Sequence, residues 1–152
     1  MQTRIDFRKV SPRAVQAMLG LQNYVNASGI EHGVLELVKM RASQINGCAY
    51  CVDMHTRDAR AAGETEQRLH AVAVWLEAPF FTPRERAALA FTESVTRLAS
   101  THVPDEAYAA VAAQFGPEEV GALLSLIVAI NAWNALSVAS RSWAPEVQGS
   151  AA

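Results

Sequence analysis

The longest uncharged stretch of the chain runs from Val120 to Ser140. This stretch restricts the possible folds of the sequence more than any other feature. Apolar residues dominate it and no proline interrupts it, so it predicts one long helix. A helix of this length could cross a bilayer. It also carries polar side chains such as Ser125, Asn131 and Asn134, and the mean hydropathy of the whole chain is only +0.07. We therefore expect a core or subunit-interface helix rather than a membrane span.

Prolines mark where other helices begin. Pro12, Pro83 and Pro117 each suit the first position of a helix, because that position needs no backbone N–H donor. Thr82 and Glu85 have the spacing of a capping box around Pro83. Glycines follow several helical patterns, and runs of alternating valine, isoleucine and threonine are absent. These signals predict helices over residues 12–27, 31–45, 49–62, 65–76, 83–100, 104–114 and 117–141.

The fold class that follows is all-α, with six or seven helices in a single domain covering residues 1–152. A length of 152 residues suits one domain. A formal charge of −2 gives no excess of positive charge for a nucleic-acid backbone. Because the last helix is apolar around most of its circumference, we expect a homo-oligomer that buries it through apolar helices. The basic N-terminal residues lack the apolar run of a signal peptide, so the expected location is cytoplasmic.

Two cysteines form the candidate reactive pair. Cys48 follows an Asn-Gly turn, at or just before the start of a helix, and Cys51 lies three residues later on the same helical face. His55 is one further turn along that face. The helix N-terminus, the second thiol and a cationic imidazole all favour the thiolate. Glu36, on the preceding helix, could reach His55 and help it to move protons.

Spacing alone leaves other interpretations open. The cysteines could be two small residues packed in a buried helix, or zinc ligands together with His55. Glu36 could be an ordinary surface carboxylate. A single straight helix surrounds an ion poorly, so a redox dithiol is the favoured interpretation.

Three further expectations concern neighbouring residues. Cys48, nearer the end of its helix, is expected to be the more exposed sulfur and the one that a reductant attacks. Asp58 could pair with His55, three residues before it. Asn131 and Asn134 need hydrogen-bond partners if they are buried, and we expect them to bond backbone across a subunit contact or to line the pocket.

Glu36, Cys48, Cys51 and His55, spaced as they are in a helical chain of this size, resemble the alkylhydroperoxidase D type of the carboxymuconolactone decarboxylase superfamily. The resemblance covers about residues 20–141 and is strongest over residues 36–63. It implies an all-α subunit assembled as a homotrimer or homohexamer. It also implies a thiol-dependent peroxidase without haem, flavin or metal. Decarboxylase members lack the cysteine pair, which argues against ring-lactone decarboxylation here.

The resemblance also implies the roles of these residues, with Glu36 and His55 as the proton relay and the cysteines as the redox dithiol. We expect Cys51 to attack an alkyl hydroperoxide or hydrogen peroxide, because it lies one turn from His55, and Cys48 to close the disulfide. A lipoyl protein or a thioredoxin-like donor would then reduce the pair. Several members have histidine where this chain has Tyr50, which cannot act as a base near neutral pH. The alternatives are a general dithiol–disulfide oxidoreductase and a zinc-stabilised helical binding module.

Overall fold

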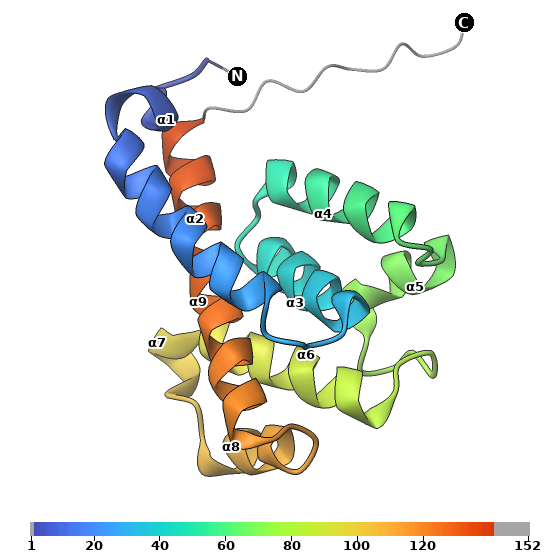
Figure 1. Ribbon diagram of the computed structural model, residues 1–152. Helices are drawn as coiled ribbons and strands as arrows, with labels where there is room; N and C mark the ends of the chain where they lie inside the picture. Colours follow the sequence, from blue (N-terminus) through green and yellow to red (C-terminus); the bar gives the residue numbers. More distant parts are fainter. Residues whose placement is uncertain (1, 142–152) are drawn as a thin grey trace, which may run out of the picture.

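The computed structural model describes residues 2–141, and within that range every regular element is helical, which confirms the all-α class (Figure 1). The elements are α1 Phe7–Val10, α2 Pro12–Asn26, α3 His32–Ile45, α4 Ala49–Ala61, α5 Glu66–Ala71, the 3-10 turn η1 Val72–Val74, α6 Pro83–Thr96, α7 Leu98–Thr101, α8 Asp105–Ala112 and α9 Pro117–Ser140.

Helix α3 lies at the centre of the fold, between α4 and α6, and packs against α9 as well (Figure 1). Its side chains are buried on nearly every face, as expected for a helix enclosed by neighbours. One apolar cluster joins α3 to α6 and α9, and a second lies where α3 meets α4, α5, η1 and α6. A polar group placed on α3 is therefore held in a dry, closely packed environment.

The predicted helix starts are close to those observed. Three helices begin at Pro12, Pro83 and Pro117, and Thr82 and Glu85 form the expected capping box. The predicted segment 65–76 is α5 followed by the tighter turn η1. The predicted segment 83–100 divides at Arg97, whose ψ of 33° interrupts the helical backbone.

Helix α9 is long and apolar enough to cross a membrane by length and composition, which is weak support for such a role because core helices pass the same test. It packs against α2, α3 and α6, as a core helix does. Leu124, Val128 and Val138 remain exposed on its other side. Burial of that side against a second subunit stays a prediction.

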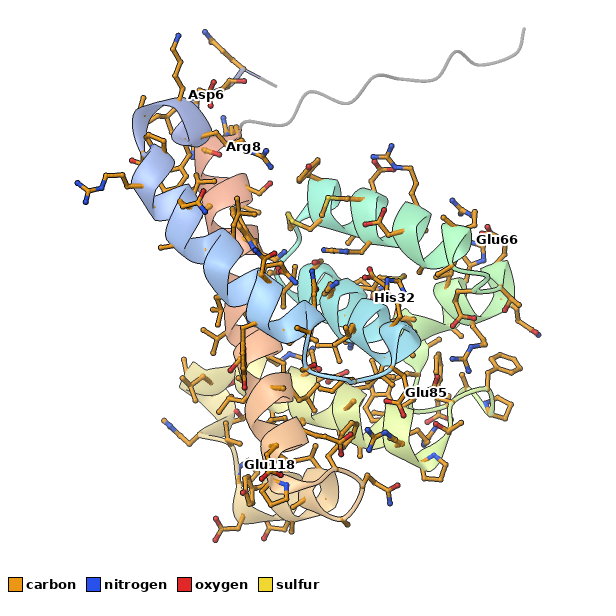
Figure 2. The ribbon with its side chains drawn as sticks, in the orientation of Figure 1. Asp6, Arg8, His32, Glu66, Glu85 and Glu118 are labelled. Carbon is orange, nitrogen blue, oxygen red and sulfur yellow. A yellow bond between two sulfur atoms is a disulfide. The ribbon has the colours of Figure 1, made fainter. Side chains whose placement is uncertain are left out.

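The N-terminal helices run along the second half of α9 (Figure 1). The backbone N–H of Arg4 donates to the carbonyl of Ser140 over 2.9 Å, which fixes the start of the described chain beside the end of α9. Asp6 and Arg8 lie in the same region (Figure 2). This arrangement places α1 and α2 opposite the beginning of α4 and encloses a cavity there.

Candidate active site

The turn between α3 and α4 positions the cysteines. Gly47 has a φ of +65°, a left-handed conformation that glycine adopts without steric cost. Cys48 follows as the N-cap of α4, and its backbone N–H donates to the carbonyl of Ser43 over 3.0 Å. Its sulfur accepts a hydrogen bond from the N–H of Cys51 over 3.4 Å. Cys48 therefore stands where the sequence predicted, at the positive end of a helix.

Cys48 and Cys51 are joined by a disulfide, with their Cα atoms 5.4 Å apart. Both residues are buried, with exposed fractions of 1% and 2%. The prediction that Cys48 is the more exposed sulfur is therefore wrong. Cys51 lines the cavity between α2, α4 and α9, whereas Cys48 does not.

Glu36 and His55 form a buried pair between α3 and α4. Glu36 Oε2 lies 3.0 Å from His55 Nδ1, and the two residues are only 3% and 7% exposed. The interpretation of Glu36 as a surface carboxylate is therefore wrong. Asp58 lies at the edge of this pair, with a carboxylate oxygen 4.0 Å from the same nitrogen.

Lys39 completes the group and was not predicted from the sequence. Its ammonium nitrogen lies 2.7 Å from Glu36 Oε1, and the residue is 7% exposed. Burial raises the pKa of Glu36, but the hydrogen bond from His55 and the positive charge of Lys39 outweigh it, so the pKa lies below its usual 4.5. The signal in the sequence was a lysine three residues after Glu36 within an otherwise apolar segment.

A cavity of about 660 Å³ gives access to this group. A volume of that size can hold a small organic molecule. Cys51, His55 and Lys39 line it, whereas Glu36 does not. Tyr50 lines the cavity as well. The apolar part of the wall consists of Phe7, Val15, Leu19, Met54, Ile130, Trp133 and Leu136.

A network of side-chain amides holds the turn before Cys48. The Asn46 amide donates to the side-chain oxygens of Asn131 (2.6 Å) and Asn134 (2.9 Å). Asn134 in turn donates to the hydroxyl of Ser43 over 3.0 Å. Neither asparagine lines the cavity, so the expectation that they line the pocket is wrong. Both bond within this chain, and a contact with a second subunit stays a prediction.

Ligand atoms of Glu36, His55 and Asp58 lie within 4.8 Å of one another, close enough for a small cation. The Lys39 ammonium already lies against Glu36 Oε1, so a metal ion there would meet a like charge. The sulfurs of the zinc set considered from the sequence, Cys48 and Cys51, are bonded to each other. We assign no metal to either group.

Comparison with known proteins places the chain in a family. The Carboxymuconolactone decarboxylase family matches residues 12–94. The uncharacterised protein YdfG of Bacillus subtilis is 41% identical over 91% of this chain and 95% of its own length. The crystal structure of ATU0492 from Agrobacterium tumefaciens, a protein of unknown function with a suggested role as the antioxidant defence protein AhpD, has 45% identity. It superposes with a TM-score of 0.91 over 95% of this chain and 99% of its own.

More distant structures share the fold alone. The debrominase Bmp8 is 22% identical with a TM-score of 0.79, over 89% of this chain and 73% of its own. Bmp8 agrees with the helical arrangement, and ATU0492 agrees with the resemblance found in the sequence. The chain belongs to the carboxymuconolactone decarboxylase family, and its resemblance is to the AhpD-like proteins within it.

Proposed function

We propose that the protein is a thiol-dependent peroxidase that reduces alkyl hydroperoxides or hydrogen peroxide with the Cys48–Cys51 dithiol. One observation carries the proposal. The Cys48–Cys51 pair lies beside the buried Glu36–His55 pair, and Cys51 and His55 line the same cavity. Buried titratable pairs in a cavity are typical of sites that move protons.

In the proposed reaction the Cys51 thiolate attacks the terminal peroxide oxygen. An S–O bond forms while the O–O bond breaks, and the alkoxide or hydroxide leaves with a proton from His55, which Glu36 holds in place. Cys51 becomes a sulfenic acid, oxidised by two electrons. The Cys48 sulfur then attacks Cys51, the S–S bond replaces the S–O bond, and water leaves.

A dithiol donor closes the cycle by thiol–disulfide exchange. The Cys48–Cys51 disulfide is reduced to the dithiol, and the donor is oxidised to a disulfide. Because Cys51 lines the cavity and Cys48 does not, a donor that enters there reaches Cys51 first. Cys48 would leave as a thiolate at the N-terminus of α4, where the helix dipole favours negative charge. A lipoyl group or the exposed dithiol of a thioredoxin-like protein has the required chemistry.

Cys51 lines a cavity that can hold a small organic molecule, which favours a small hydroperoxide as the substrate. Assembly as a homotrimer or homohexamer is part of the proposal, because it would cover the exposed apolar side of α9. The proposed location is the cytoplasm, where a disulfide is usually catalytic rather than structural.

Peroxide consumption coupled to a lipoyl or thioredoxin recycling system tests the proposal. Wild-type protein should consume cumene hydroperoxide through many turnovers, and the Cys51→Ser variant should consume none above background. Faster reduction of an oxidised protein substrate than of the hydroperoxide would instead favour a general disulfide oxidoreductase. One zinc ion per subunit in purified protein whose thiols are inert to peroxide would favour the binding module.

A further inference from the structure

The buried cation beside Glu36 has no part in the reaction described above. Lys39 is one of two lysines in the chain, and the other, Lys9, is exposed. Burying an ammonium group is costly unless it is paired and hydrogen-bonded. Lys39 is paired with a single carboxylate, that of Glu36, at 2.7 Å. The Lys39 ammonium is buried at the wall of the cavity, and its charge acts on the Glu36 carboxylate that it contacts.

Each oxygen of Glu36 is hydrogen-bonded to a different side chain. Lys39 takes Oε1 and His55 Nδ1 faces Oε2 over 3.0 Å. An ionised carboxylate accepts hydrogen bonds and cannot donate them. When Glu36 is ionised, His55 must therefore carry its proton on Nδ1, which leaves Nε2 as the ring nitrogen that exchanges a proton with substrate.

Without a positive charge at residue 39, burial would act on Glu36 with less opposition. Burial raises the pKa of a carboxyl group, and a protonated Glu36 could donate to Nδ1 and so select the other tautomer of His55. The ammonium of Lys39 opposes that change, and it does so from the cavity wall that Cys51 and His55 share.

We propose that Lys39 is a positioning residue of this site, which holds Glu36 as a carboxylate turned toward His55 and so sets the protonated nitrogen of the imidazole. This inference rests on the proposed peroxidase function and adds to it the group that determines at which pH the relay operates. Lys39 donates its hydrogen bond to Glu36, so it acts through Glu36.

Other titratable groups face the same pair and must be held constant in a test. On α3, His32 Nε2 lies 3.6 Å from Glu36 Oε1, and the exposed side chain is labelled in Figure 2. On α4, Asp58 lies 4.0 Å from His55 Nδ1. Glu64 lines a second hollow with Glu36 but is paired with Arg68 over 2.9 Å.

The main cavity adds three more such groups, Asp6 and Arg8 from the N-terminal segment and Tyr50 from α4. All of these groups are unchanged by a substitution at residue 39. A change in the pH profile of such a variant therefore reports the loss of the Lys39 charge.

The experiment compares three substitutions in the full-length protein. Lys39→Met removes the charge and the hydrogen bond, Lys39→Gln keeps a hydrogen-bond donor but no charge, and Lys39→Arg keeps both. We expect the acid limb of the profile of kcat/KM against pH to move to higher pH in the Met and Gln variants, with a loss of about 10-fold or more near neutral pH. Lys39→Arg should restore most of the activity, and Lys9→Met should match wild type.

Titration of the Glu36 carboxyl carbon by NMR gives a readout that needs no turnover. In the Lys39→Gln variant, Glu36 should become protonated at a higher pH than in wild type. This variant still provides the measurement if Lys39→Met does not fold. An unchanged carboxyl titration and an unchanged pH profile in the Gln variant would overturn the role of Lys39. Failure of wild-type protein to consume peroxide would instead overturn the proposed function, and the titration would still decide what Lys39 does to Glu36.

Discussion

Glu36 Oε2 lies 3.0 Å from His55 Nδ1, although 19 positions separate the two residues along the chain. The contact depends on the antiparallel return of α4 over α3, which the short turn at Asn46 and Gly47 makes possible. It joins a carboxylate that does not line the cavity to an imidazole that does.

Replacing Glu36 with glutamine should impair the relay. The neutral amide cannot stabilise a cationic imidazole as a carboxylate does, so the peroxidase kcat should fall by about 100-fold. Steady-state kinetics with cumene hydroperoxide measures the effect. Glu77→Gln, on an exposed position, is the matched control and should behave as wild type. Equal activity of both variants would remove Glu36 from the relay.

The two cysteines should give different products when each is replaced by serine. Cys48→Ser retains the attacking sulfur and has no second thiol to condense with it, so a sulfenic acid should accumulate. Intact-protein mass spectrometry should find one added oxygen atom after one equivalent of peroxide. Cys51→Ser should gain none under the same conditions, and the reverse pattern would assign the attack to Cys48.

Asn134 should stabilise the turn that carries the dithiol. It is fully buried, and it links Asn46 to the hydroxyl of Ser43. Asn134→Ala leaves those groups short of a partner, and the free energy of unfolding should fall by about 2 kcal/mol. Urea denaturation measures it, with the exposed Asn23→Ala as control. A loss no larger than that of the control would show that the network does not support the turn.

Glu93 should contribute a pH-dependent part of the stability. Trp75 and Arg97 each donate to it over 2.7 Å, and Arg41 Nε donates over 2.8 Å. Burial raises the pKa of Glu93, but the hydrogen bonds from Trp75 and Arg41 outweigh it, so the pKa is lowered. Its contribution is thus fully present above the ordinary value of 4.5 and is lost as the pH falls through the lower folded value.

Glu93→Gln should therefore lower the free energy of unfolding by about 2 kcal/mol at neutral pH. The difference from wild type should shrink below pH 4.5. Urea denaturation at several pH values measures both quantities. Other carboxylates with lowered pKa values, such as Glu36 and Glu85, titrate in both proteins, so their effects cancel in the difference. If the difference in free energy of unfolding between the two proteins stayed constant at low pH, the pH-dependent contribution of Glu93 would be contradicted.

Much of the fold could be predicted because its signals are local. A proline at the first helical position and a capping box at Thr82 act through the nearest turn of backbone, and these features were found where expected. The spacing of Cys48, Cys51 and His55 is local too, since all three belong to one helix and its cap.

The rest of the site depends on contacts between distant segments, which no local signal specifies. From the sequence alone, Lys39 would be taken for an exposed charge. In the structure it is buried at the wall of a cavity that residues of α9 and of the N-terminal helices also line. Cys48 was expected to be exposed because helix ends usually are. Here the turn before it is hydrogen-bonded through Asn46 to Asn131 and Asn134, which lie more than 80 positions away. Glu36 is buried only because α4 returns across it.

Reduction of a peroxide by the Cys48–Cys51 dithiol within one subunit can be followed in a single-turnover experiment. Fully reduced protein is mixed with one equivalent of cumene hydroperoxide, without any recycling donor, and the alcohol, free thiols and disulfide are quantified over time. We expect one molecule of alcohol to form and one Cys48–Cys51 disulfide to be gained per subunit. Hydroperoxide that persists while both thiols stay reduced would contradict it.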